Sequence, residues 1–346
     1  MKRSQSVVLV PYQIRVKKRG TKEYLALDKL PGGQQFLTLF RQFLLKHQYA
    51  KIATVPSDAV SVTVDEDEQT AFRVNNFWQR GAIQGDDETP IQSIDAMIEL
   101  GVYGLKSTLV NVETASEREK DRSEADLASF YIRLDLHTGI DRGVLLVQEY
   151  GRQKCRGQFT KNLNRFFREN DDYSGFTLEV QSLVTEEYLE SMTNGAVIKS
   201  VKLCRPMRYK DASDRLHGGV TDSPCGSVEI ILRPNKGGSF LMKISEAISS
   251  LKESLNGKTP TGNLILVEPD AEYEWAKMEI EMQGRKRTLN LRREGGMLPF
   301  MSIDVSDDVT VDEDSGYPHT ESIRKVAADI VRDMVAPLGW AHVPTN

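Results

Sequence analysis

Six cationic side chains and no acidic one lie between residues 152 and 168: Arg152, Lys154, Arg156, Lys161, Arg165 and Arg168. The first three alternate along the chain, so in an extended segment they project from one face. The last three are spaced i, i+4 and i+7 on a predicted helix whose apolar stripe includes Phe159, Leu163 and Phe166. Like charges at this spacing repel each other by roughly a few tenths of a kcal/mol. The stretch therefore predicts a surface that meets an anionic partner, with an ordinary solvated basic face as the alternative.

Two further segments carry candidate phosphate-binding residues with no acid among them: Arg205, Arg208 and Lys210 within residues 199–210, and Arg285, Lys286 and Arg287 at the tip of a predicted hairpin. A hairpin tip has a suitable shape for reaching a groove or a phosphate backbone. Binding of Lys and Arg to phosphates is driven by counterion release and is largely independent of base sequence. Together the three clusters predict a protein that binds DNA with little sequence preference.

The chain as a whole is acidic, with a formal net charge of −5 over 346 residues, so the segregation of charge is more informative than its sum. Acidic patches at residues 65–68 and 304–314 leave a protein-interaction scaffold as an alternative function. No run of about 18 apolar residues occurs, so no transmembrane helix is predicted. Cys155, Cys204 and Cys225 are odd in number and widely spaced, which indicates free thiols in a reducing compartment. We expect a cytoplasmic protein.

Motifs for nucleotide, metal or nucleophile chemistry are incomplete. The sequence NGKT at 256–259 lacks the upstream glycine of a P-loop and fits better as the end of a helix. No HxH, HExxH or CxxC pair offers a metal site. A hydrolase would have to rely on Cys225 assisted by His217. We predict no catalytic residue, no metal and no cofactor, and keep the hydrolase as an alternative.

A metal-dependent nuclease is the other enzymatic alternative, because DNA is the predicted partner. Its carboxylates would be Asp270, Glu272 and Glu274, gathered around magnesium with Lys277 beside them. The step from Glu274 to Lys277 is one residue too long, which places the lysine on the opposite face of a strand.

Hydrophobic periodicity predicts an α+β fold of two mixed parts, each a mainly antiparallel sheet with a few helices. A first strand is expected at residues 6–18, with an edge or bend at Pro11. Helices are predicted at 34–47, at 91–104, in the basic stretch, at 239–257 and at 320–334. Polar turn formers at 169–175 predict a boundary between an N-terminal domain, residues 1–170, and a C-terminal domain, residues 175–346.

The order of these elements resembles a known family. The matching segments are QQFLTLFRQFLLKHQ (34–48), VEIILRP (228–234), WAKMEIEMQGRKRTLNL (275–291) and ESIRKVAADIVRDM (321–334). They resemble the RexA proteins of the lambda-phage exclusion system and, more distantly, the KwaB-like proteins of bacterial phage defence. The resemblance implies a cytoplasmic, homodimeric DNA-binding protein of phage exclusion or defence that acts with a small membrane partner. Its basic hairpin would correspond to Arg285, Lys286 and Arg287.

Overall fold

The computed structural model describes most of the chain: residues 6–48, 62–80, 93–137, 139–150, 153–184, 188, 196–208, 224–235, 240, 244–255, 273–292 and 300–338. Within these residues the fold is mixed and strand-rich, and every pair of neighbouring strands is antiparallel. The α+β fold class with antiparallel sheets is confirmed at this level. The described residues contain more strand, relative to helix, than the sequence indicated.

The elements are as follows. The strands of the large sheet are β1 (Val7–Lys18), β2 (Thr63–Asp65), β3 (Thr70–Arg80), β4 (Ser93–Val102), β7 (Asp126–Asp135), β8 (Gly143–Tyr150), β9 (Gln153–Lys154), β10 (Phe176–Ser182), β11 (Ala196–Arg208), β12 (Pro224–Leu232), β13 (Trp275–Met282), β14 (Arg285–Arg292) and β15 (Phe300–Asp304). A separate hairpin consists of β5 (Ser107–Val110) and β6 (Glu117–Lys120). The α-helices are α1 (Phe36–Lys46), α2 (Arg156–Glu169), α5 (Ile244–Leu255) and α6 (Thr320–Val335).

Strand β1 lies in the middle of the large sheet, whose main order is β12-β11-β13-β14-β15-β1-β8-β7-β4-β3-β2. On one side β1 pairs with β8 along most of its length, and on the other it pairs first with β15 and then with β10. Pro11 falls where the partner changes, between Leu9, paired to β15, and Tyr12, paired to β10. The missing N–H of proline therefore interrupts neither ladder. The predicted break at Pro11 is a change of partner inside a central strand.

Strand β4 corrects the helix predicted at residues 91–104. Its apolar residues Ile94, Ala96, Ile98 and Leu100 alternate with a more polar set, which is the period of a strand. Both sets are buried, because β4 lies between β3 and β7 and has layers on both faces. Burial on both faces obscures the alternation, and the resulting apolar run resembles a short buried helix.

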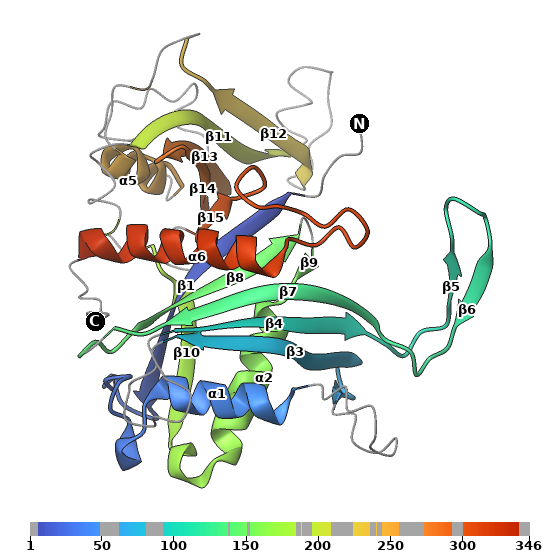
Figure 1. Ribbon diagram of the computed structural model, residues 1–346. Helices are drawn as coiled ribbons and strands as arrows, with labels where there is room; N and C mark the ends of the chain where they lie inside the picture. Colours follow the sequence, from blue (N-terminus) through green and yellow to red (C-terminus); the bar gives the residue numbers. More distant parts are fainter. Residues whose placement is uncertain are drawn as a thin grey trace.

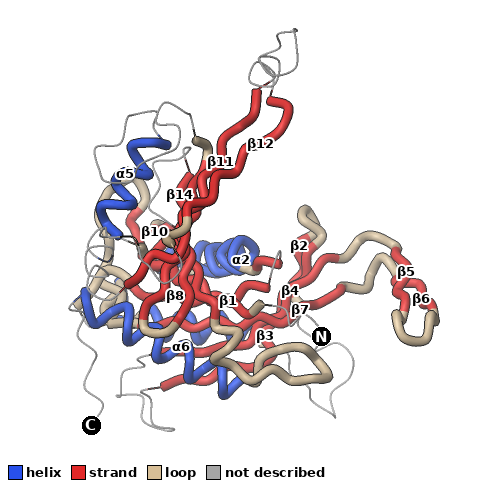
Figure 2. The backbone as a smooth tube through the Cα atoms, turned by 90° about the horizontal axis from the view of Figure 1, so that it is seen from above, coloured by secondary structure: helices blue, strands red, loops and turns tan. Residues whose placement is uncertain are grey.

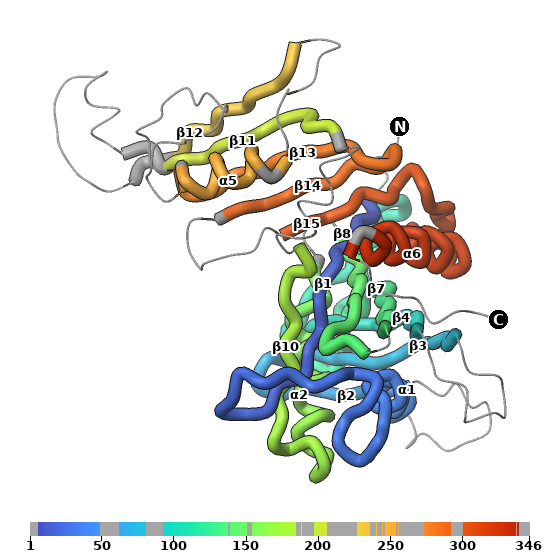
Figure 3. The backbone as a smooth tube through the Cα atoms, turned by 90° about the vertical axis from the view of Figure 1, so that its left-hand side faces the viewer, coloured from blue at the N-terminus to red at the C-terminus, as the bar shows by residue number. Residues whose placement is uncertain are grey.

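Helices cover both faces of the sheet around β4, β7 and β8 (Figure 1). Helices α1 and α2 pack together on one face. The ring centres of Phe40 and Phe159 are 6.2 Å apart, and those of Phe36 and Phe167 are 6.1 Å apart. Helix α6 covers the other face with Ile323, Ala327 and neighbouring apolar residues. The outer strands β11 to β15 carry α5 (Figure 3).

The large sheet runs across the predicted domain boundary at residues 169–175. Strand β10, which follows this boundary, pairs with β1, and β1 also pairs with β15. The two groups of strands seen in Figure 3 thus share hydrogen-bonded neighbours. The division into residues 1–170 and 175–346 stays a prediction.

Candidate nucleic-acid interface

Helix α2 presents its basic side chains where the sequence predicts them. Phe159, Leu163 and Phe167 are buried against α1 and the sheet, which fixes the rotation of the helix. Lys161, Arg165 and Arg168 consequently lie on another face. This local arrangement follows from the amphipathic period alone.

Two of these three cations are bound by acids from a distant part of the sequence. The Nζ of Lys161 lies 3.0 Å from Oδ2 of Asp65 and 2.8 Å from Oε1 of Glu68, in the turn between β2 and β3. The Nη2 of Arg165 donates to the same Asp65 Oδ2 at 2.5 Å. We call these four residues the α2 clasp. The interpretation of Lys161 and Arg165 as unpaired like charges is wrong, because their acidic partners lie about one hundred residues earlier in the chain.

The charges of the clasp stabilise one another. Hydrogen bonds from Lys161, from the backbone N–H of Glu68 and from Arg165 lower the pKa of Asp65 to about 2. Glu68 and Asp65 in turn raise the pKa of Lys161. The Asp65 residue is only 7% exposed, and burial opposes the lowering of its pKa without outweighing the hydrogen bonds. Lys161 and Arg165 remain 38% and 37% exposed, so an anion from solvent can reach them.

The remaining cations of the stretch have different surroundings. Lys154 is exposed and lies 3.7 Å from Oε2 of Glu149. The guanidinium of Arg156 lies over the ring of Tyr12, 5.0 Å from its centre. Arg168 is exposed and, among the described residues, donates to the carbonyl of Asn164 in its own helix, at 3.2 Å. Arg152 lies outside the described residues.

The hairpin tip differs from the prediction. The turn is made by Gln283 and Gly284, both with positive φ, and Arg285 begins β14 after it. Arg285 pairs with Asp308 at 2.9 Å and with Asp333 at 3.7 Å. Arg287 is only 1% exposed and donates to the hydroxyl of Tyr188 at 2.7 Å. The assignment of Arg287 to a phosphate contact is therefore corrected, since the side chain points into the protein.

Of the three predicted hairpin cations, Lys286 is the exposed one, and Glu281 lies opposite it in the β13–β14 register. The hairpin also lies in a different part of the molecule from α2 (Figures 1 and 3). The structure does not bring the two clusters into one groove.

The cluster at residues 199–210 lies on β11, where acids of neighbouring strands face its cations. Lys199 pairs with Glu281 at 2.9 Å and Lys202 with Glu229 at 2.7 Å. Arg205 is half-buried and has interaction partners of its own. Arg208 is the last residue of β11, but its side chain is not described, and Lys210 lies outside the described residues.

The enzymatic alternatives find little support in the residues that are described. Lys277 pairs with Glu279 at 3.3 Å, and Glu274 is exposed before β13 begins. Asp270, Glu272 and His217, together with the NGKT sequence, lie outside the described residues, and the side chain of Cys225 is not described. The described residues contain no group of three or more His, Cys, Asp or Glu placed to hold a metal ion.

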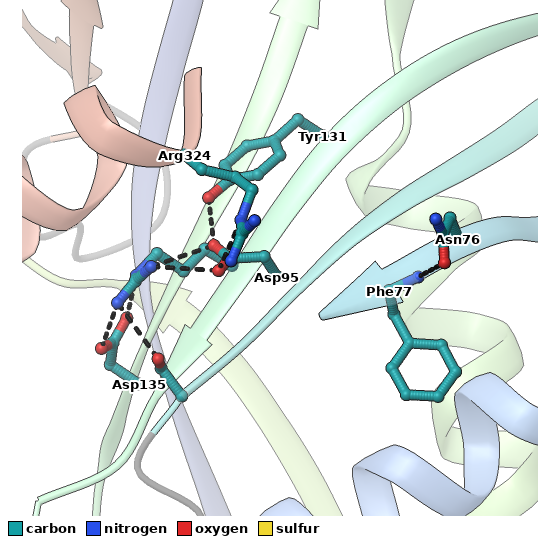
Figure 4. A network of polar contacts seen from close by, with 8 residues as sticks. Asn76, Phe77, Asp95, Tyr131, Asp135 and Arg324 are labelled. Carbon is teal, nitrogen blue, oxygen red and sulfur yellow. Dashed lines mark hydrogen bonds and ion pairs between the residues drawn. The ribbon is translucent and has the colours of Figure 1, made fainter. Parts of the chain in front are cut away.

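A second ionic group, which sequence reasoning missed, lies between the sheet and α6 (Figure 4). It consists of Ser93 and Asp95 on β4, Tyr131, Arg133 and Asp135 on β7, and Arg324 on α6. We call it the buried network. Its strand residues share one face of the sheet, because Asp95 pairs with Arg133 and Ser93 with Asp135 in the β4–β7 register.

Arg133 is the centre of the buried network. Its Nη1 donates to Oδ1 of Asp95 at 3.0 Å, and its Nε donates to Oδ2 of Asp135 at 2.6 Å. Burial opposes the charge of Arg133, but the two carboxylates outweigh burial and raise its pKa. The hydroxyl of Tyr131 donates to Asp95, and burial followed by the charge of Asp95 raises the pKa of that tyrosine. Every ionic group in the network has an opposite charge or a hydrogen bond, as a desolvated ion requires.

The sequence did contain a signal for this network. In residues 93–99 the positions between the apolar ones are Ser93, Asp95, Met97 and Glu99, so a strand would place the polar ones on one face. The helix interpretation of this segment hid that face. No sequence pattern indicates which helix covers it, since Arg324 comes from a segment 229 residues away.

Comparison with known proteins finds no family model that matches the sequence and no match among curated proteins. Among the described helices, none combines the length and the apolar character needed to cross a membrane.

Proposed function

We propose that the chain binds nucleic acid through the outer face of α2, with little dependence on base sequence. One observation carries the proposal: Lys161 and Arg165 converge on a single anionic oxygen, Asp65 Oδ2, at 3.0 and 2.5 Å. Two cationic donors around one oxygen are also what a bound phosphate requires. Arg168, exposed one turn further on, extends the same face.

In this proposal the turn of Asp65 and Glu68 occupies the place of a phosphate when nucleic acid is absent. Because the pKa of Asp65 is lowered to about 2, the carboxylate stays ionised at neutral pH and competes with a phosphate for Lys161 and Arg165. Binding then requires the exchange of one anion for another. The affinity is consequently lower than the number of cations suggests, and it falls as salt rises.

The test measures the affinity for a short duplex DNA at several salt concentrations. Changing Lys161 and Arg165 together to Gln should weaken binding tenfold or more and reduce the slope of log K against log[salt] by about 2. Asp65→Asn should strengthen binding, because it removes the competing charge. Lys199→Gln, which removes an exposed paired cation on β11, is the matched control and should change little.

Two results would reject the proposal. One is the absence of any DNA binding at low salt by both the wild-type protein and Asp65→Asn. The other is binding that Lys161→Gln with Arg165→Gln leaves unchanged. Cleavage of the DNA in the presence of magnesium would favour the nuclease alternative instead.

A wider role is proposed from the family resemblance of residues 34–48, 228–234, 275–291 and 321–334. In it the protein is a cytoplasmic homodimer that takes part in phage exclusion or defence together with a small membrane protein. Plating of phages on cells with and without the gene, and with and without a neighbouring membrane-protein gene, tests this role. Equal plating in all four strains would reject it.

A second candidate function is a protein-interaction scaffold. The acidic segment at 304–314 suggested it, and the exposed apolar residues of the β5–β6 hairpin favour it more directly. Their chemistry leads to a more specific inference.

A further inference from the structure

The hairpin β5–β6 projects from the body of the protein as an arm (Figures 1 and 2). We use the word arm for residues 103–125, which connect β4 to β7. Several large apolar side chains of the arm are exposed: Leu105 at 72%, Leu109 at 40%, Val110 at 51% and Val112 at 94%. Apolar side chains gathered on one projecting element are typical of a segment that packs against a partner.

The two faces of the arm carry opposite charges. In the β5–β6 register Leu109 is opposite Arg118, so these two side chains share one face. Val110 is opposite Glu117 and shares the other face with Glu119. One face of the arm therefore carries Leu109 and Arg118, whose guanidinium pairs with Glu124 of the same arm at 2.9 Å, and the other face carries Val110 and two carboxylates.

A cavity of about 1150 Å³ opens where the arm joins the body. Its apolar lining includes Leu100, Leu127 and Phe130, at the end of β4 and the start of β7. Three carboxylates also line it, Asp126 on β7 and Asp312 and Glu313 in the loop before α6, together with one cation, Lys154 on β9, so the carboxylates outnumber the cation. Its volume exceeds the roughly 300–1,000 Å³ that is usual for small-molecule sites and suits a polypeptide segment.

The cavity also contains hydrogen-bond donors that lack partners. Tyr150 is 4% exposed, and a hydrogen bond from the Gln148 side chain limits the rise in its pKa, but its O–H finds no acceptor within the described chain. The amide nitrogen of Gln158, at the start of α2, is buried and has no partner there either. Buried donors of this kind are normally satisfied. Backbone carbonyls at the outer edge of a β-strand are suitable acceptors for both.

We propose that the occupant of this cavity is the arm of a second copy of the chain, seated with its Leu109–Arg118 face inward. Leu109 then contacts the apolar lining, and Arg118 approaches Asp126 and Glu313 in exchange for Glu124, its partner in the single chain. The anionic face with Glu117 would be repelled by the same carboxylates. Charge thus selects one of the two faces of the arm.

Two-fold symmetry makes the exchange reciprocal. The cavity lies at the base of the arm, where β4 ends and β7 begins. A two-fold rotation that places one arm in the partner's cavity therefore also places the partner's arm in the first protomer's cavity. The arm extends roughly 25 Å from residue 103 to 111, which sets the distance between the two roots. Each dimer contains two such contacts, which doubles the buried area toward the roughly 1,200–2,000 Å² of a stable interface. The proposal does not depend on nucleic-acid binding.

The test is the mass of the full-length protein in solution, measured by sedimentation equilibrium over a range of concentrations. The wild-type protein should be a dimer. Leu109→Asp and Arg118→Glu should each weaken the dimer at least tenfold, and so should Glu313→Arg on the cavity side. Val110→Asp and Glu117→Arg, on the opposite face of the same arm, are the matched controls and should leave the dimer intact.

A charge exchange makes the test specific. The variant that combines Arg118→Glu with Glu313→Arg should recover most of the dimer, because the attraction is restored with reversed sign. A monomeric wild-type protein overturns the proposal, and so does a dimer that Leu109→Asp, Arg118→Glu and Glu313→Arg do not weaken. Equal weakening by Glu117→Arg and Arg118→Glu overturns the assignment of the face. Lys161→Gln with Arg165→Gln should not change the mass, which separates this test from that of DNA binding.

Discussion

The α2 clasp and the buried network are both groups of paired charges, but they lie in very different surroundings. In the network the side chains of Asp95, Arg133 and Asp135 are only 4%, 7% and 8% exposed. In the clasp Lys161 and Arg165 are more than one third exposed. The network holds β4 and β7 to α6, whereas the clasp holds the turn between β2 and β3 to α2.

The difference in burial decides what each group can do. Opening a desolvated ion pair leaves uncompensated charges in a medium of low dielectric constant, so the network is locked. In the clasp the Asp65 side chain is only 6% exposed, but its two cationic partners are more than one third exposed, so opening the pair returns those cations to water at a lower cost. The clasp can therefore exchange its carboxylates for another anion, and the network cannot. Ion pairs of similar length thus differ in how easily they open, because their burial differs.

The largest expected effect is on folding stability when Arg133 is changed. Arg133→Met leaves Asp95 and Asp135 buried with much of their compensation removed, so the free energy of unfolding should fall by about 3–5 kcal/mol. Urea unfolding followed by circular dichroism measures this change. Arg324→Met should cost less, because Arg324 is 34% exposed and Asp95 keeps its bonds to Arg133 and Tyr131.

The comparison between the two regions needs the matching change in the clasp. Arg165→Met removes one half-exposed cation and should shift the melting temperature only slightly. If Arg165→Met and Arg133→Met destabilise the protein equally, the distinction drawn from burial is wrong.

The next effect is the dependence of stability on pH near the clasp. His47, at the end of α1, lies between the rings of Phe43 and Phe72, and burial followed by the charge of Lys46 lowers its pKa to about 4. A lowered histidine pKa means that the unfolded chain binds the proton more readily. The stability it contributes is present above pH 6.5 and is lost as the pH falls toward 4. The loss should be roughly 3 kcal/mol, at about 1.4 kcal/mol for each unit of pKa shift.

Unfolding free energies of the wild-type protein and of His47→Gln, measured from pH 7 to pH 4, isolate this contribution. The variant should show a flatter dependence than the wild-type protein. Asp65 does not interfere in this range. Its lowered pKa means that its contribution is present above about pH 3.8 and is lost only as the pH falls through 2. Parallel curves for the wild-type protein and His47→Gln would show that the histidine is not shielded.

Local pattern predicted much of the fold. Four predictions are confirmed: the strand at residues 6–18 as β1, the helices at 34–47 and 320–334 as α1 and α6, and the hairpin around residues 283–286 as β13–β14. These elements have one buried face and therefore a clear period. Strand β4 is buried on both faces, which obscures its alternation of apolar and more polar residues, and it was wrongly predicted as a helix.

The candidate site was harder to predict for a different reason. The rotation of α2 follows from Phe159 and Leu163, so the positions of Lys161 and Arg165 were correct. Their partners, however, come from Asp65 and Glu68, and a segment without acids in sequence need not lack them in space. Arg287 was predicted at the hairpin tip, but the turn ends at Gly284 and Arg287 lies two positions into β14, where its side chain points into the protein. The sequence did not show at which residue the turn ends. The order of charged residues along the chain shows where cations lie in the sequence, but it says little about which of them have a carboxylate beside them in the fold.

The smallest expected effect is that of salt on the clasp. Raising the salt from about 0.05 M to 0.5 M shortens the Debye length from roughly 14 Å to 4 Å and weakens exposed pairs much more than buried ones. Part of the salt dependence of the wild-type melting temperature should therefore come from Lys161, Arg165, Asp65 and Glu68. Asp65→Asn should remove that part, whereas Arg324→Met, in the network, should leave it in place. If Asp65→Asn retains the wild-type salt dependence, solvent ions do not compete within the clasp. A phosphate would then have no easier access than a chloride ion, and the exchange of anions proposed for α2 would lose its physical basis.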